Sequence, residues 1–145
     1  TFYHDTATDA KAIVETEIEQ SVRLQKNTTP LALSLTKYAA GEQISFCDIP
    51  ICAARTSFQR KVLARCQLIP YGCTMTYGDI AKQVGHPGAA RAVGGVMRAN
   101  NCPLVVPCHR VLGSNGKLTG FSAGTGLDLK QRLLQMEGIN QEFVF

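Results

Sequence analysis

The sequence predicts an α/β chain of the α+β kind, built in two parts. A mainly helical C-terminal domain over residues 51–145 carries a winged-helix-like helix-turn-helix and short strands, and a reduced N-terminal α/β subdomain with a linker precedes it over residues 1–50. Apolar residues recur at helical spacing in several segments, capping residues bound those segments, and a connector containing Pro50 separates the two parts. With 145 residues, 45% of them hydrophobic, the chain is long enough to bury one core.

Two helices and a strand are expected in the N-terminal part. Apolar residues recur at helical spacing over residues 9–25, with charged residues between them. A second helix has Thr29 as its N-cap, Pro30 at its first position and Gly41 at its close. Residues 44–47, Ile-Ser-Phe-Cys, are typical of a short strand.

A helix-turn-helix is expected in the C-terminal part. After a helix over residues 57–68, Thr76 is placed to cap a short helix, with Asp79 forming an imperfect capping box and Gly85 at the left-handed C-terminal position. A His-Pro-Gly turn then leads into a longer helix over residues 89–100. This arrangement is typical of DNA-binding helix pairs, and the alternative is an ordinary pair of core helices.

The longer helix, AARAVGGVMRAN, consists almost entirely of small residues plus Arg91 and Arg98. Small residues let a backbone approach a surface closely but offer few hydrogen bonds to base edges. Such a helix would bind DNA through shape and phosphate contacts, unless the small residues serve close packing against another helix.

Charge is distributed unevenly along the chain. Residues 1–57 carry five Lys and Arg against seven Asp and Glu, whereas residues 58–138 carry ten against three. The basic segment suits a polyanion such as nucleic acid, and the alternative is a solvated basic surface.

No apolar run is long enough to span a membrane, and the first twenty residues lack the basic start and apolar centre of a secretion signal. We therefore expect an intracellular protein without membrane contact, resident in the cytoplasm, or in the nucleus if the source is eukaryotic.

Six cysteines lack the density of a disulfide scaffold, so free thiols are expected. No pair has the CxxC spacing of a zinc site, and the chain holds three histidines. We expect no metal; the alternative is a site that combines His4 with Cys47 or Cys52.

The segment Val-Val-Pro-Cys-His-Arg-Val over residues 105–111 carries the candidate chemistry. Only a few per cent of an ordinary thiol is ionised at neutral pH, and His109 and Arg110 are placed to assist Cys108. Neighbouring side chains on a strand point to opposite faces, so His109 needs a kink at Pro107 or a bridging water to act on the thiol. The alternative is a buried, inert cysteine.

Residues 58–138 closely resemble the C-terminal domain of the O6-alkylguanine-DNA alkyltransferases, also called methylated-DNA-protein-cysteine methyltransferases. The resemblance rests on the motifs FQRKVL, IPYGCTMTYGDIA, AARAVGGVMRAN, VPCHRV, GKLTGFS and LKQRLLQMEG, which match in order and approximate spacing. Residues 31–57 resemble the family's linker, whereas the first thirty correspond poorly to its sheet-bearing N-terminal domain.

The resemblance implies a catalytic role for five residues. Cys108 matches the alkyl acceptor, and His109, through a water, and Glu137, through the histidine, match the relay that removes the thiol proton. Tyr77 matches the tyrosine that donates a hydrogen bond or proton to the departing guanine, and Asn100 matches the hinge asparagine. The alternatives are helix caps for Tyr77 and Asn100 and a solvated carboxylate for Glu137.

The resemblance also implies contacts to DNA and to the base. Arg91 matches the arginine that replaces the flipped nucleotide in the stack. The other DNA-binding positions are Tyr77, Ala90, Gly94, Arg98 and Ser114. Met97, Val111, Phe121 and Ser122 fall where the family lines its guanine pocket, as does Ser114, and Lys130 falls where the family has a lysine. Simple surface charge for Arg91 and core packing for Met97 and Phe121 are the alternatives.

Three departures from the family pattern stand out. Asn101 replaces the usual proline after the hinge asparagine and has Cys102 beside it, Phe121 replaces a common tyrosine, and the loop over residues 123–126 is about two residues longer.

The reaction that the resemblance implies needs no cofactor and happens once per molecule, because no step regenerates a thiol from a thioether. Its partner would be double-stranded DNA, bound through the minor groove by a monomer with the O6-alkylguanine flipped out. An alkyltransferase-like damage sensor is the runner-up, but such proteins usually replace the acceptor cysteine, commonly with tryptophan, and this chain has Cys108 and no tryptophan. A helix-turn-helix regulator that reads an operator and a cysteine hydrolase are competing functions of a different class.

Overall fold

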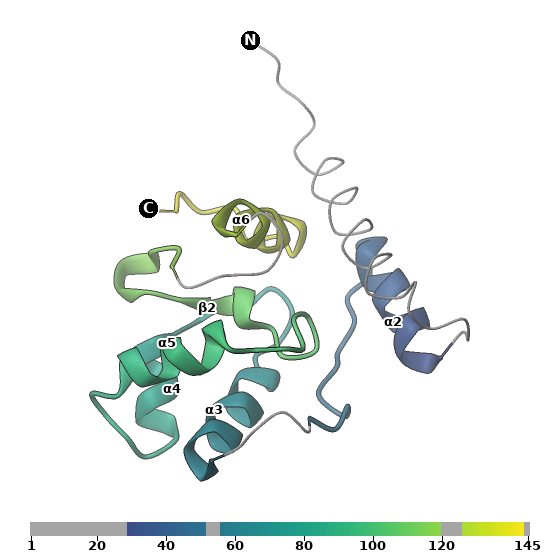
Figure 1. Cartoon of the computed structure of the whole chain (residues 1–145). Coiled ribbons are helices and arrows are strands. Elements are labelled where there is room, and N and C mark those ends of the chain that lie inside the picture. The colour runs from purple at the N-terminus through teal and green to yellow at the C-terminus, as the bar shows by residue number, and fades with distance from the viewer. Residues whose placement is uncertain (1–28, 52–55, 120–125, 144–145) are drawn as a thin grey trace.

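The computed structural model describes residues 29–51, 56–119 and 126–143. These form a mainly helical body with one pair of very short strands, which confirms the predicted α/β fold class (Figure 1). In chain order the elements are α2 (Pro30–Ala39), α3 (Ser57–Gln67), β1 (Met75–Thr76), α4 (Tyr77–Gln83), α5 (Ala90–Arg98), a 3-10 turn (Cys108–Arg110), β2 (Val111–Leu112), a second 3-10 turn (Ser114–Gly116) and α6 (Leu127–Met136).

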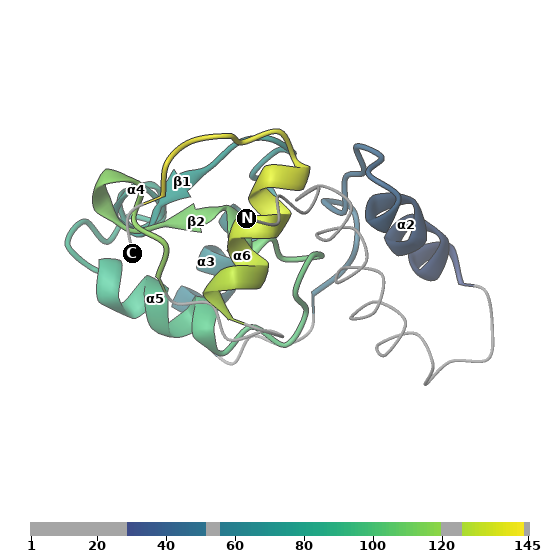
Figure 2. The same cartoon turned by 90° about the horizontal axis from the view of Figure 1, so that it is seen from above.

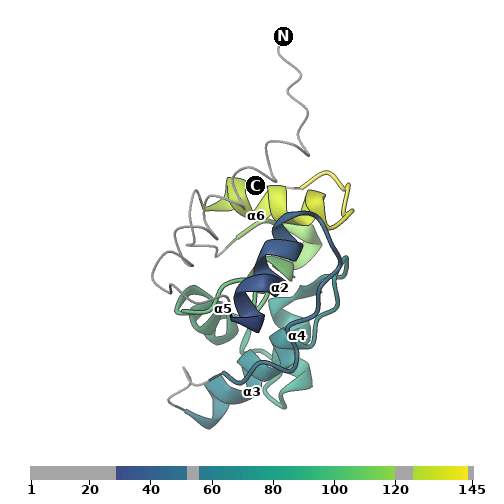
Figure 3. The same cartoon turned by 90° about the vertical axis from the view of Figure 1, so that its right-hand side faces the viewer.

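The two strands run parallel, with Met75 opposite Val111 and Thr76 opposite Leu112. Parallel strands need a crossover, and α4 and α5 supply it. Seen from two directions, α6 lies on one side of the strands and α5 on the other, while α2 lies at the edge of the body (Figures 1 and 2). When the edge that carries α2 faces the viewer, α2 crosses in front of the rest of the body (Figure 3).

The main core is formed by α3, α4, α5 and the segment that leads into β2. Its centre holds Val62, Ile80, Val93, Val106 and Val111, all completely buried. Cys108 belongs to the same cluster. A second cluster joins α2 to α6 through Tyr38, Phe46, Val105, Leu129 and Leu133. Cys108, the candidate nucleophile, therefore lies within the main core.

Local capping signals set the helix starts as predicted. The Thr29 side chain accepts a hydrogen bond from the Ala32 N–H at the start of α2. The box at α4 is complete rather than imperfect: Thr76 Oγ1 accepts from the Asp79 N–H, and the Asp79 carboxylate accepts from the Thr76 N–H. Gly85 adopts φ +86° just after α4, the left-handed geometry expected there.

Helices α4 and α5 pack closely across a tight turn and form the predicted helix-turn-helix outline. Two helices are shorter than expected. Helix α5 covers Ala90–Arg98 rather than residues 89–100, and α3 ends at Gln67 rather than at residue 68. No helix in the described parts of the chain has the length and apolar character needed to cross a bilayer.

The strand predicted over residues 44–47 is wrong. The chain there is irregular and pairs with no strand of the described residues. Instead, the side-chain amide of Gln67, the last residue of α3, donates to the carbonyls of Phe46 and Ile49, at 2.7 and 2.8 Å. These bonds supply hydrogen-bond partners for two backbone carbonyls of this segment. The helix predicted over residues 9–25 lies outside the described residues, and the boundary at residue 50 stays a prediction.

We predict that Thr76→Ala destabilises the protein by about 1 kcal/mol. The variant lacks the hydroxyl oxygen that accepts from the Asp79 N–H, and this bond forms one half of the capping box whose other half is the bond from the Thr76 N–H to the Asp79 carboxylate. Urea unfolding measures the change. Thr36→Ala is the matched control, since Thr36 is in the middle of α2 and bonds the Ala32 carbonyl, so its loss should be close to neutral. Equal losses in both variants would contradict a capping role for Thr76.

Candidate active site

Cys108 opens a 3-10 turn directly after Pro107. Of the two ways in which His109 could act on Cys108, the structure shows the kink after Pro107. In a 3-10 turn, successive side chains are separated by about 120° rather than pointing to opposite faces. Cys108 and His109 can thus serve one site despite being neighbours in the chain.

Asn100, just beyond α5, holds this turn in place. Its Nδ2 donates to the Val106 carbonyl at 3.0 Å and contacts Cys108 Sγ at 3.3 Å, and its Oδ1 accepts from the Cys102 N–H at 3.0 Å. The side chain therefore ties the end of α5 to the cysteine turn and also contacts the thiol directly.

The Glu137 carboxylate is the buried centre of the site, and its residue is 5% exposed at the C-terminal end of α6. Its Oε1 accepts from Tyr38 Oη at 2.5 Å, His109 Nε2 at 2.8 Å and Arg110 Nη2 at 2.8 Å. Its Oε2 accepts from Arg110 Nε at 2.9 Å and the Gly72 N–H at 3.2 Å. Four separate segments meet at this one carboxylate.

Gly72 reaches the carboxylate through an unusual backbone conformation. Its φ of +75° favours glycine, and a Cβ there would lie 3.3 Å from the Glu137 carbonyl oxygen. A glycine is therefore needed for the N–H to approach Glu137 closely.

Electrostatics keep Glu137 ionised. Burial by itself raises the pKa of this carboxyl, but the hydrogen bonds from His109 and Arg110 and the charge of Arg110 outweigh burial and hold the pKa well below its usual range. Burial lowers the pKa of His109, and the contact with Glu137 opposes that shift only in part. The pair is therefore a carboxylate and a neutral imidazole at neutral pH.

The carboxylate also determines which histidine nitrogen carries the proton. An ionised carboxylate can only accept hydrogen bonds, so His109 Nε2 must donate to Glu137. Nδ1 then keeps its lone pair and is the nitrogen that can act as a base.

The thiol of Cys108 is buried, with the residue 6% exposed. Burial raises its pKa, while the hydrogen bond from Asn100, the charge of Lys130 and the N–H groups of the cysteine turn lower it. Because burial prevails, removal of the thiol proton requires a base within reach, such as His109.

Lys130 is completely buried on α6. Its Nζ donates to the carbonyls of Val111, at 2.5 Å, and Thr119, at 2.8 Å, and lies 5.7 Å from the centre of the Tyr77 ring. Burial lowers its pKa to about 8. Tyr77 Oη donates to the same Thr119 carbonyl at 2.7 Å, so the predicted proton donor is bonded to the backbone here. Burial raises the pKa of Tyr77 and keeps its proton in place.

Of the predicted DNA-contacting residues, Tyr77 is buried in the main core, and the others lie nearer the surface. Arg91 and Arg98 are exposed on α5, Ala90 is half-buried at its start, and Ser114 is exposed in the second 3-10 turn. Gly94 faces Tyr77, because a Cβ at Gly94 would lie 4.0 Å from that ring.

Of the predicted pocket residues, Met97 and Val111 are buried in the core cluster that includes Cys108. The described residues do not include Phe121, Ser122 or the first three residues, 123–125, of the loop over 123–126. Cys47, Cys66, Cys73, Cys102 and Cys108 are free thiols, as expected.

Within the described ranges, no three His, Cys, Asp or Glu side chains come together in a group that could hold a metal ion. His4 and Cys52, which belong to the alternative metal site, lie outside these ranges.

Comparison with known proteins identifies the chain's relatives. The family model for the 6-O-methylguanine DNA methyltransferase DNA-binding domain matches residues 57–139. The chain belongs to this family. The match covers α3 to α6 and therefore Asn100, Cys108, His109 and Glu137, but it leaves out α2.

Curated members of this methyltransferase family are also similar to the chain over most of its length. A methylated-DNA–protein-cysteine methyltransferase of Methanosarcina acetivorans is 50% identical over 72% of this chain and 65% of its own length. The constitutive enzyme of Bacillus subtilis is 45% identical over 73% of this chain and 63% of its own length. The chain thus spans a little under two thirds of these relatives.

Solved structures of family members share the fold. The Mycobacterium tuberculosis OGT structure in complex with DNA is 44% identical, with a TM-score of 0.69 over 76% of this chain and 65% of that one. The structure of S. pombe Atl1 with damaged DNA containing O6-carboxymethylguanine is 37% identical, with a TM-score of 0.52 over 59% of this chain and 80% of that one.

Two partners of Glu137 in this family member, Tyr38 and Gly72, were not predicted from the sequence. Tyr38 comes from α2, where no local motif marks it. Gly72 comes from the turn before β1 and lies within the motif IPYGCTMTYGDIA, but the motif gave it no role in the site. Arg110 was expected to assist the thiol, but its guanidinium binds Glu137 and the Ile69 carbonyl.

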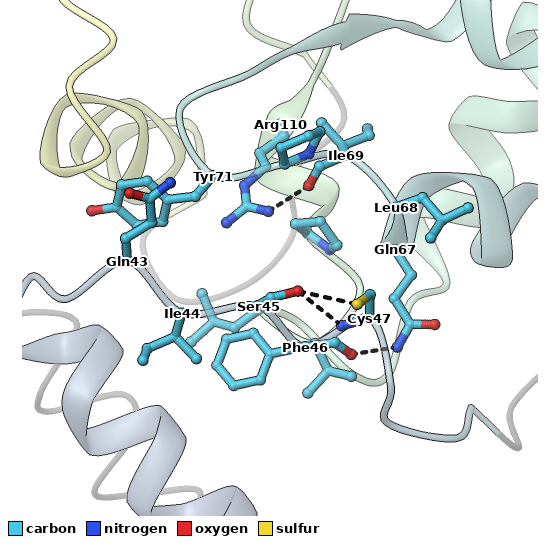
Figure 4. Close-up of a pocket in the computed structure, with 14 residues that line it drawn as sticks. Gln43, Ile44, Ser45, Phe46, Cys47, Gln67, Leu68, Ile69, Tyr71 and Arg110 are labelled. Atoms are coloured by element: carbon cyan, nitrogen blue, oxygen red, sulfur yellow. Dashed lines mark hydrogen bonds between the residues drawn. The ribbon is translucent and has the colours of Figure 1, made fainter.

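Arg110 and Pro107 also border a pocket of about 390 Å³. The pocket runs between the irregular segment after α2 and the turn before β1, with Tyr71 and Phe46 among its walls (Figure 4). Cys108 does not line it, so this pocket is separate from the thiol.

We predict that Glu137→Gln destabilises the protein by about 3 kcal/mol or more at pH 7, because the buried Arg110 charge loses its partner. The folded pKa of Glu137 lies below its unfolded value, so its stabilising effect is complete above about pH 4.5 and is lost as the pH falls further. Urea unfolding at pH 7 and pH 3 should therefore show a smaller difference from wild type at pH 3.

Glu142→Gln is the matched control, since Glu142 is exposed, and it should be close to neutral at both pH values. A Glu137→Gln variant as stable as this control at pH 7 would contradict the ion pair's role.

Proposed function

We propose that this protein repairs DNA by moving the alkyl group of O6-alkylguanine to its own Cys108, once per molecule and without a cofactor. The observation that carries the proposal is a buried cysteine held by Asn100 beside a His109–Glu137 pair, in a chain that belongs to the methyltransferase family. The curated relatives are named methylated-DNA–protein-cysteine methyltransferases, which supports the same reaction here.

The transfer is a displacement at a saturated carbon. The Cys108 proton passes through a water to His109 Nδ1, the sulfur forms a bond to the alkyl carbon, and the bond from that carbon to O6 breaks. Glu137 stabilises the imidazolium that results. The departing guanine takes up a hydrogen bond or proton from Tyr77, whose hydroxyl exchanges its bond to Thr119 for one to the base. The proton taken from the thiol then leaves His109 through water and restores a neutral guanine and a protonated Tyr77, so no net charge remains.

Double-stranded DNA is the proposed partner. A monomer would place α5 in the minor groove, with the small residues Ala90 and Gly94 against the sugar-phosphate backbone of the DNA. Arg98 and Ser114 would contact phosphates. Arg91 would fill the space of the flipped nucleotide. The flipped base would enter a pocket lined by Met97, Val111, Phe121, Ser122 and Lys130. The relative from M. tuberculosis solved with DNA supports this proposal.

We predict that Cys108→Ala abolishes transfer but retains binding to damaged DNA, because the variant lacks the nucleophile and keeps the α5 surface. An oligonucleotide duplex with labelled O6-methylguanine measures both. Cys73→Ala, which removes an exposed thiol, should transfer like wild type. Label on the Cys108→Ala chain would contradict the proposal, and binding without transfer by wild type would indicate a damage sensor instead.

We predict that Arg91→Ala slows repair of duplex DNA about tenfold or more, since unstacking a base costs a few kcal/mol. The free base O6-benzylguanine needs no flipping, so its reaction with the variant should keep nearly the wild-type rate. Arg60→Ala, an exposed arginine on α3, serves as the control. Equal slowing on both substrates would exclude a flipping role for Arg91.

A further inference from the structure

Tyr38 links α2 to the chemistry of the cysteine turn, although it lies 71 residues before His109 and outside the family match. The side chain is 1% exposed. Its ring packs edge-on against Phe46 and Tyr71, each at 6.0 Å between ring centres, and is tilted against His109 at 6.5 Å. This packing on three sides fixes the direction of the hydroxyl.

That hydroxyl points at the Glu137–His109 pair. It donates to Glu137 Oε1 at 2.5 Å, and the same phenolic oxygen lies 3.4 Å from His109 Nε2. Oε1 is also the atom to which His109 Nε2 donates. Tyr38 and His109 therefore share one acceptor, and the position of Oε1 depends on both.

We propose that Tyr38 is a positioning residue for alkyl transfer, whose hydroxyl holds Glu137 Oε1 against His109 Nε2 and so keeps His109 Nδ1 unprotonated and oriented to receive the thiol proton. This inference rests on the proposed function. It makes the last turn of α2 part of the proton relay, although α2 carries none of the residues that contact the thiol.

The hydroxyl tunes the relay as well as orienting it. By donating to Oε1 it neutralises part of the carboxylate's charge, which would otherwise stabilise a protonated His109 more strongly. The other charged and titratable groups that face the pair are Arg110 on the same turn, Lys130 on α6 and Tyr71 before β1. Burial and the nearby carboxylate raise the pKa of Tyr38 well above its ordinary value, so its hydroxyl stays a donor throughout the working range.

Tyr38→Phe tests the proposal, because it removes the hydroxyl and keeps the packed ring. We expect transfer to slow about tenfold, a loss typical of one hydrogen bond to a charged group. The slowing should be equal on O6-methylguanine duplex and free O6-benzylguanine, since the effect acts through the thiol chemistry. The acidic limb of the rate profile should move to higher pH, because His109 becomes easier to protonate.

Tyr71→Phe is the matched control. Its ring also packs against Tyr38, but its hydroxyl donates to the Met136 carbonyl at 3.2 Å and not to Glu137. We expect this variant to retain the wild-type rate and pH profile. Equal rates for Tyr38→Phe and Tyr71→Phe, or slowing of Tyr38→Phe on duplex alone, would overturn the proposal.

Nitrogen-15 NMR of histidine in the free protein separates this inference from the proposed function. Wild type should show His109 with its proton on Nε2, and Tyr38→Phe should show a higher His109 pKa. If wild type transfers no alkyl group, the proposed function fails, whatever the NMR shows. If wild type transfers it while Tyr38→Phe leaves both the rate and the His109 titration unchanged, only the role of Tyr38 fails.

Discussion

The bond network of the Glu137 carboxylate is the constraint on which the rest of the site depends. A buried charge is costly unless every lone pair is satisfied, and here Tyr38, Gly72, His109 and Arg110 together satisfy it. These donors come from α2, the turn before β1 and the cysteine turn, while the carboxylate ends α6. One side chain thus fixes the positions of four segments that are distant in the sequence, and the orientation of His109 follows from it.

A second set of contacts places the thiol. Asn100 joins the end of α5 to the cysteine turn, so a helix exposed on one side is mechanically linked to the buried sulfur. Lys130 donates hydrogen bonds to the carbonyls of Val111 and Thr119, and the Tyr77 hydroxyl donates to the same Thr119 carbonyl. Burial makes the sulfur a weak acid at rest, and these polar neighbours moderate that effect. The thiol therefore needs a base to lose its proton.

The parts of this fold that depend on neighbouring residues could be predicted from the sequence. Thr29 and Thr76 cap helices because their partners lie three residues away, and the PCHRV motif identified the cysteine turn. The strand over residues 44–47 was wrong because alternating apolar residues do not reveal whether a partner strand exists. Tyr38 could not be found, since its contact with Glu137 spans 99 residues and carries no local pattern. Phe121 and Ser122 remain predictions.

The site of alkylation is the most direct test of the repair reaction. The protein is incubated with an excess of duplex containing O6-methylguanine, and its peptides are then mapped by mass spectrometry. One methyl group per chain, in thioether linkage to Cys108 and unchanged by longer incubation, is the expected result. Methyl groups on Cys66 or Cys102, more than one group per chain, or continued release of repaired DNA from an unmodified protein would contradict it.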